Sequence, residues 1–310
     1  RTSNPLSKEL AMPAINQELS KLRITNGTDE SIIGSVIEKS EPLGKFGQVE
    51  KVINETKYLL KGWIPFGMLT GLIAEPGIGK SAFALYGLVR PVLTGCNWFN
   101  GTKGPKPGYV LLCPTEHDLG ITLTRVRQWG IPTDKILLPF KDVLKSIDLT
   151  NPDHLKQIEG IIGEYKVKLV VIDTLRGSHN EDENNSKIIN VVNAISDIAE
   201  RTGCAIVVVH HTKKLMLDEE MRANSCRGNG AIMSMMRSMI GIDHPDPNSK
   251  WCRMRVLKEN LGLAPKPIGF LVSDVGLEFG AAPEKTHKPT ERDKAMEWLK
   301  QRMKPGKVYN

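Results

Sequence analysis

The sequence predicts an α/β protein whose central sheet is mostly parallel and flanked by helices, with antiparallel edge strands toward the C-terminal part. Three observations support this prediction. Several short runs are apolar throughout, which is typical of parallel strands covered on both faces. A stretch with helical apolar spacing lies between two of these runs. A glycine-rich loop joins the first run to a further helical stretch, as in phosphate-binding proteins.

The predicted strands begin after residue 58 and recur through most of the chain. They are the runs Met68–Ala74, Tyr109–Cys113, Lys168–Asp173, Ala205–His210, Met239–Ile242, Trp251–Leu257 and Ile268–Val272. Ile188–Ala199 carries an apolar helical stripe that ends before Gly203, so it predicts one right-handed strand-helix-strand unit. The turn-forming residues 243–248 separate later runs and favour an antiparallel edge there.

Three segments divide the chain. Residues 1–56 are polar and predict a linker with peripheral helices, residues 57–280 hold the strands and motifs, and residues 281–310 predict a linker followed by a helix over Arg292–Met303. Because the first residue is not methionine, we expect an excised piece of a longer polypeptide, with a further module removed from an end.

Composition restricts the class of protein. With 310 residues, 40% of them hydrophobic and 25% charged, the chain falls in the globular range, which excludes collagen, a coiled-coil rod and general disorder. It has neither an apolar run long enough to cross a bilayer nor a signal peptide, so we expect a cytoplasmic protein without membrane contact. Five scattered cysteines argue against disulfides and structural zinc.

The net charge of +7 is weak support for a nucleic-acid partner. Residues 281–310 contain eight Lys or Arg and four Asp or Glu, so this short tail supplies more than half of the excess. A nucleic-acid interface must therefore be argued from particular loops rather than from the overall charge.

A phosphate-binding loop follows the first predicted strand. Residues 74–81 match Gly-x-x-x-x-Gly-Lys-Ser/Thr with Ala74 in the first glycine's place. Backbone N–H groups of such a loop surround phosphate oxygens, so Lys80 is expected at the β- and γ-phosphates of ATP and Ser81 at Mg²⁺. The predicted ATP-binding set is Glu75, Pro76, Gly77, Ile78, Gly79, Lys80, Ser81 and Ala82. The alternative is a simple turn that opens a helix.

Four further side chains lie at or just past the ends of predicted strands. Asp173 ends one strand and suits Mg²⁺ binding, although strands often end in Asp as a turn starter. Glu116 lies just past another strand, where it can orient and polarise an attacking water or can be an ordinary loop carboxylate. His210 and His211 end the next strand, where imidazoles can sense the γ-phosphate.

Six motifs agree in order and spacing with one family. They are Trp63–Gly67, the phosphate loop, Pro114–Asp118, Val171–Thr174, Asp182–Asn184 and Val209–Lys214. Together they resemble the RecA-like ATPases of the plasmid RepA helicase type, a group also found as the helicase half of phage primase-helicases. The resemblance covers about Tyr58 to Leu277. It implies a RecA-like core, a hexameric ring around single-stranded DNA, ATP-driven translocation, and a primase or other replication protein as a partner.

The resemblance also assigns roles to residues. It implies Lys80 and Ser81 at phosphates and metal, Glu116 in water activation, Asp173 at Mg²⁺ and His211 in nucleotide sensing. The family's DNA-binding loops match residues 176–187 and 213–230. The second loop offers the cations Lys213, Lys214, Arg222 and Arg227, whereas the first is acidic at Glu181, Asp182 and Glu183. The alternative for both loops is that they are solvated connections between elements and do not bind DNA.

Two cations are candidates for completing a neighbour's ATP site. Arg237 is the lone charge in the helix-like run 231–238, and Lys258 follows the predicted strand Trp251–Leu257 at a position resembling the family's trans-acting basic residue. Arg237 equally suits a surface-facing helix end. Three functions therefore share this core: a ring-forming DNA helicase, a nucleotide-controlled switch or regulator that unwinds nothing, and a strand-exchange recombinase.

Overall fold

The computed structural model describes residues 56–115, 119–143, 145–183, 187–214, 219–228, 230–246, 249–285 and 291–302. The predicted N-terminal linker, apart from Thr56, lies outside these residues. A two-stranded antiparallel sheet, β1 (Tyr58–Leu60) and β2 (Ile64–Pro65), precedes the main sheet. No helix in the described part is both long and apolar enough to cross a membrane.

The main sheet has nine strands in the order β11-β10-β9-β8-β3-β7-β6-β4-β5. The strands are β3 (Leu69–Ala74), β4 (Val110–Pro114), β5 (Ile136–Leu137), β6 (Leu169–Asp173), β7 (Ala205–His211), β8 (Ser238–Asp243), β9 (Cys252–Glu259), β10 (Ile268–Ser273) and β11 (Gly276–Ala281). Strands β3 to β8 pair in parallel, and β9 to β11 pair antiparallel. The predicted parallel sheet and antiparallel edge are both confirmed.

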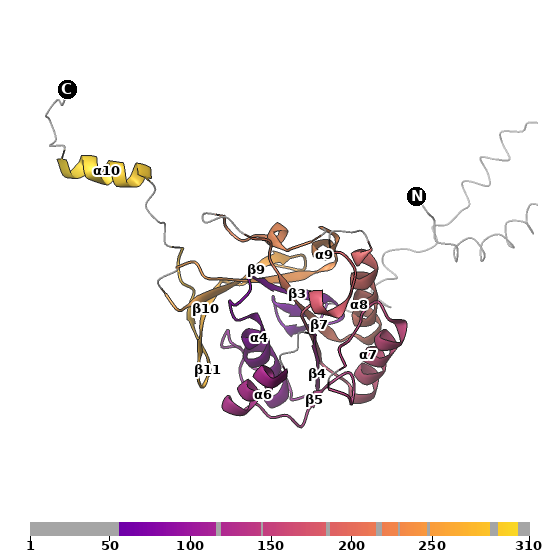
Figure 1. Cartoon of the computed structure of the whole chain (residues 1–310). Coiled ribbons are helices and arrows are strands. Elements are labelled where there is room, and N and C mark those ends of the chain that lie inside the picture. The colour runs from indigo at the N-terminus through magenta and orange to yellow at the C-terminus, as the bar shows by residue number, and fades with distance from the viewer. Residues whose placement is uncertain are drawn as a thin grey trace, which may run out of the picture. The chain divides into compact units, whose positions relative to one another are not determined.

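Helices cover both faces of this sheet (Figure 1). One face packs against a continuous helical segment made of α4 (Lys80–Phe83), the π-helix η1 (Ala84–Val89) and α5 (Arg90–Thr94), together with α6 (Leu119–Gln128). The other packs against α7 (Pro152–Tyr165), α8 (Ile188–Thr202) and α9 (Gly230–Met235). The short 3₁₀ turns η2 (Arg176–Ser178) and η3 (Ala223–Ser225) and helix α10 (Glu291–Arg302) complete the described elements.

The continuous apolar runs are explained by this two-sided covering. Alternate strand residues enter different cores: Leu72 and Ala74 of β3 join the core beneath α4, whereas Leu69 and Ile73 join the core beneath α8. Side chains on a strand alternate between faces, and both faces here are dry. A run without polar alternation is therefore what this position in the fold requires.

Register brings the predicted site residues to one edge. Ala74, the last residue of β3, pairs with His211 of β7, and Asp173 of β6 pairs with Val209 of β7 and Pro114 of β4. The carboxyl ends of four parallel strands thus meet where the phosphate loop begins. Ligands of open α/β sheets bind at this edge.

Candidate nucleotide site and adjoining loops

The phosphate loop spans the five residues between β3 and α4. Gly77 and Gly79 have φ angles of 79° and 97°, values that side chains with a Cβ rarely adopt. A Cβ at Gly77 would meet no atom within 4 Å, so the loop is open beside it. The first N–H groups of the following helix have no acceptor in the preceding turn. The loop therefore has the backbone that an anion site needs.

Lys80 is held at the mouth of this loop and is only 6% exposed. Its Nζ donates to the carbonyl oxygens of Ala74 at 3.2 Å and Glu75 at 2.9 Å, and lies 3.3 Å from Nδ1 of His211. Two motifs 131 residues apart in sequence are thus in contact. The structure thus brings the Lys80 ammonium next to the His211 imidazole, two groups that the sequence assigned to the ATP phosphates.

Asp173 and Ser81 both carry side-chain oxygen atoms and belong to elements that meet this edge of the sheet. Asp173 ends β6 and is partly buried, and Ser81 follows Lys80 in the first turn of α4. Strand β6 lies two strand spacings from β3, or about 10 Å. Among the described residues no three His, Cys, Asp or Glu side chains form a group that could hold a metal. A hydroxyl and a carboxylate suit Mg²⁺ when phosphate oxygens supply further ligands.

Glu116 lies outside the described residues, but the chain leading to it is described. Strand β4 ends at Pro114 beside Asp173, and the amide of Thr115 donates to the Asp173 carbonyl at 2.8 Å. The residue before Glu116 is therefore fixed at the same sheet edge.

The two adjacent histidines point in different directions because consecutive strand residues face opposite sides of a sheet. His211 contacts Lys80, whereas His210 is completely buried, with Nε2 3.0 Å from the Arg227 carbonyl and Nδ1 3.8 Å from Oε1 of Glu183. Burial lowers the pKa of His210 to about 4. His210 is thus a neutral interior group between two loops, and His211 is the one at the phosphate loop.

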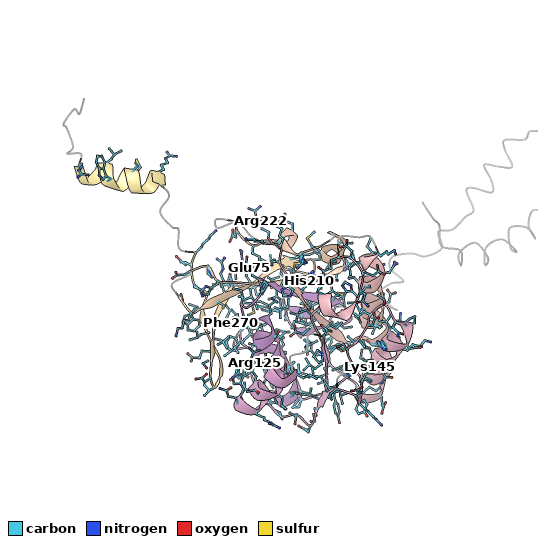
Figure 2. All side chains as sticks on the ribbon, in the orientation of Figure 1. Glu75, Arg125, Lys145, His210, Arg222 and Phe270 are labelled. Carbon is cyan, nitrogen blue, oxygen red and sulfur yellow. The ribbon has the colours of Figure 1, made fainter. Side chains whose placement is uncertain are left out.

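The predicted DNA-binding loops are joined by ion pairs. Glu183 is buried, and its Oε2 lies 3.5 Å from Nε of Arg227 in the other loop. Lys213 pairs with Glu219 at 3.4 Å. Lys214 and Arg222 are exposed. Figure 2 shows Arg222, Glu75 and His210 toward one end of the molecule in this view, away from Arg125 and Lys145.

The side chain of Glu183 is buried and does not face solvent, as it would in a solvated acidic loop. Its side chain turns inward because His210 and Arg227 lie beneath and beside it. A Cβ at Gly228 would come within 2.9 Å of the Glu183 carbonyl, so the two loops pack backbone against backbone.

The helical prediction for Arg237 is wrong. Helix α9 ends at Met235, and the Arg237 amide donates to the Leu69 carbonyl at 3.0 Å, which begins the pairing of β8 with β3. Its side chain is exposed. Lys258 lies within β9 rather than after it, and its Nζ donates to the Met233 carbonyl at 2.8 Å near the end of α9. Burial, and secondarily the charge of Arg237, lower the pKa of Lys258.

Comparison with known proteins identifies the family to which this chain belongs. Residues 38–216, more than half of the chain, match the AAA domain family. The chain belongs to the AAA domain family. This matched segment contains the phosphate loop, Asp173 and His211, and it identifies the protein as a RecA-like P-loop ATPase.

Relatives of this AAA domain protein include DNA-processing proteins. The DNA repair and recombination protein RadB of Methanocaldococcus jannaschii is 18% identical over 232 residues, covering 72% of this chain and 98% of RadB. The crystal structure of KaiC-like protein PH0186 of Pyrococcus horikoshii has a TM-score of 0.53 at 16% identity, covering 72% of this chain and 93% of that one. A DnaB-like replicative helicase, described with its interactions with primase, has a TM-score of 0.54 at 12% identity, covering 86% and 70%. These similarities show the RecA-like fold.

Sequence reasoning missed two features of the AAA domain site. The first is the inward turn of Glu183 onto His210, which depends on how two loops pack and has no local signature. The second is a buried threonine pair, Thr115 and Thr174, between β4 and β6. The sequence signal that could have predicted this pair is a threonine directly before Glu116 and another directly after Asp173.

Proposed function

We propose that this protein is an ATP-dependent, ring-forming replicative DNA helicase or translocase of the plasmid RepA type. It forms a homo-oligomer, a hexamer, that hydrolyses ATP at subunit interfaces and binds single-stranded DNA. A primase or other replication protein is its partner, and the cytoplasm its compartment. The observation that carries the proposal is the contact of Lys80 with His211 at the sheet edge where Asp173 also ends its strand.

The chemistry follows from the charges at this edge. ATP phosphates replace the Ala74 and Glu75 carbonyls as partners of Lys80, whose ammonium then neutralises the β- and γ-phosphate oxygens. Ser81 and Asp173 hold Mg²⁺, which when bound offsets negative charge on the phosphates. Glu116 orients the attacking water and accepts its proton.

His211 connects hydrolysis to the second loop. Its imidazole contacts Lys80, the residue proposed to bind the phosphates. Its backbone carbonyl accepts a hydrogen bond from the Arg227 amide at 3.0 Å. Loss of the γ-phosphate therefore acts on a residue bonded directly to a predicted DNA contact. Cations of this loop bind DNA phosphates without reading bases, since neither loop carries an aromatic residue for stacking.

A nucleotide-controlled switch that unwinds nothing is the second candidate. The ion pairs of Lys213 with Glu219 and of Arg227 with Glu183 favour it, because both cations already have carboxylate partners within the chain. DNA phosphates must replace those carboxylates in the helicase, whereas a switch can keep them.

Electron microscopy with a non-hydrolysed ATP analogue separates the two functions. We expect closed rings, with density in the pore once single-stranded DNA is added. Rings that never bind DNA, or a monomer indifferent to DNA, would support the switch and contradict the helicase. Lys80→Ala protein serves as the control, since it should fail to assemble in response to the nucleotide.

A further inference from the structure

Thr115 links the end of β4, which leads to the predicted base Glu116, to the end of β6, where the predicted Mg²⁺ ligand Asp173 lies. The residue is 7% exposed and is the first after β4. Its hydroxyl oxygen accepts from the Thr174 amide at 2.7 Å and donates to the Thr174 carbonyl at 2.8 Å. Its own amide donates to the Asp173 carbonyl at 2.8 Å. Both its backbone and its side chain thus bind the two residues at the end of β6.

The turn after β6 is held on its other side as well. The Leu175 amide donates to the Val209 carbonyl at 2.8 Å, which fixes the turn to β7. A Cβ at Gly177 would lie 2.4 Å from the Thr115 hydroxyl oxygen, so the turn packs directly over that side chain. The threonine is therefore enclosed between two chain segments.

We propose that Thr115 is a positioning residue for ATP hydrolysis. It holds the end of β4, from which the chain continues to Glu116, against Asp173, whose carbonyl its amide binds. This inference rests on the proposed role of Glu116 as the base that orients water. Thr115 acts by fixing the end of β4, from which the chain continues to Glu116.

Removing the hydroxyl separates this role from nucleotide binding. Thr115→Val keeps the shape of the side chain but takes a hydrogen-bond partner from both the N–H and the C=O of Thr174. The phosphate loop belongs to a different strand, β3, so nucleotide binding should persist. Misplacing a catalytic group by about 1 Å can cost about a hundredfold in rate. We therefore expect kcat to fall by about tenfold to a hundredfold, with the KM for ATP changed by less than about threefold.

Two matched variants test whether the lost hydrogen bonds cause the effect. Thr115→Ser keeps the hydroxyl and should recover most of kcat. Thr70 is also fully buried, and within the described part of the chain its hydroxyl has no hydrogen-bond partner. Thr70→Val makes the same chemical change in the body of β3 and should leave kcat within about twofold of the original. If Thr115→Val does not fold, Thr115→Cys, whose thiol is a weak hydrogen-bonding group, takes its place.

Combination with Glu116→Gln tests whether Thr115 acts through that carboxylate. If it does, Thr115→Val should lower turnover of the Glu116→Gln protein by less than about threefold, because no base remains to be positioned. Multiplication of the two losses would show that Thr115 acts elsewhere and would overturn the inference. So would Thr115→Val protein with the kcat of Thr70→Val protein.

The same measurements separate this inference from the proposed function. If Glu116→Gln alone retains normal turnover, the assigned base is wrong, and the positioning role is contradicted with it. If Glu116→Gln is inactive while Thr115→Val is fully active, the proposed chemistry survives and only the role of Thr115 is contradicted.

Discussion

The two ends of strand β3 differ in what the chain builds around them. At the carboxyl end, Lys80 contacts His211, and the neighbouring strand ends are tied together through Thr115 and Thr174. At the amino end, Arg237 directly precedes β8, lies beside Leu69 and has an exposed side chain, while Lys258 donates to a carbonyl of α9. The carboxyl end therefore brings the predicted site residues of several strands together, whereas the amino end exposes the cationic side chain of Arg237 to solvent.

Geometry excludes a role for Arg237 at its own phosphate loop. It lies beside Leu69, five residues before Ala74, which is about 17 Å along a strand. An arginine side chain does not cover that distance through a packed sheet. If Arg237 neutralises a γ-phosphate, the phosphate belongs to a neighbouring subunit.

The largest effect that tests this difference is the loss of Arg237. Arg237→Ala should still bind ATP but hydrolyse it about a thousandfold more slowly, the scale of a lost arginine finger. Mixing it with Lys80→Ala protein should restore some turnover, because mixed interfaces pair an intact phosphate loop with an intact Arg237. Steady-state ATPase measured across mixing ratios tests this.

Lys258→Ala is the comparison variant. Its ammonium donates to the Met233 and Ser234 carbonyls near the end of α9, so its loss should also lower the free energy of unfolding by about 1 kcal/mol. Mixtures that assemble but show no recovery at any ratio would contradict a shared site for the residue tested.

A smaller effect is expected from the loop cations at the carboxyl end. Replacing Lys213, Lys214 and Arg227 by Ala should weaken single-stranded DNA binding and flatten its salt dependence by up to three contacts, about 0.7 in slope for each. Fluorescence anisotropy between 50 and 200 mM salt, about a twentyfold change in affinity for three contacts, measures this.

The control for the loop cations removes the same charge elsewhere. Arg125, Lys145 and Lys156 belong to other segments, and Arg125 and Lys145 lie away from Arg222 in Figure 2. Their triple alanine variant should retain the original salt slope. An unchanged slope in the loop variant would place the DNA on another surface.

Local sequence was sufficient for the phosphate loop and the strands around it. Glycines at 77 and 79 and a lysine before the helix define a backbone shape by themselves, and unbroken apolar runs define strands that are buried on both faces. Register then follows from parallel pairing, which brings Asp173 and His211 to the same edge.

Other features depend on contacts between distant segments. The helix-like composition of residues 231–238 did not reveal that the Arg237 amide would pair with β3 instead. The inward turn of Glu183 needs His210 of β7 and Arg227 of the second loop, both more than 25 residues away in sequence. Strand β5, two residues long, is too short for any periodicity.

The most direct test of the account compares nucleotide binding and turnover in two variants of the carboxyl end. Lys80→Ala should lose binding and hydrolysis together, because its ammonium is the partner of the phosphates. Glu116→Gln should bind ATP as the original protein does while its turnover falls by about a hundredfold or more, the scale of a lost general base. Near-normal turnover in either variant, measured alongside its affinity for ATP, would contradict an ATPase site built at this end of β3.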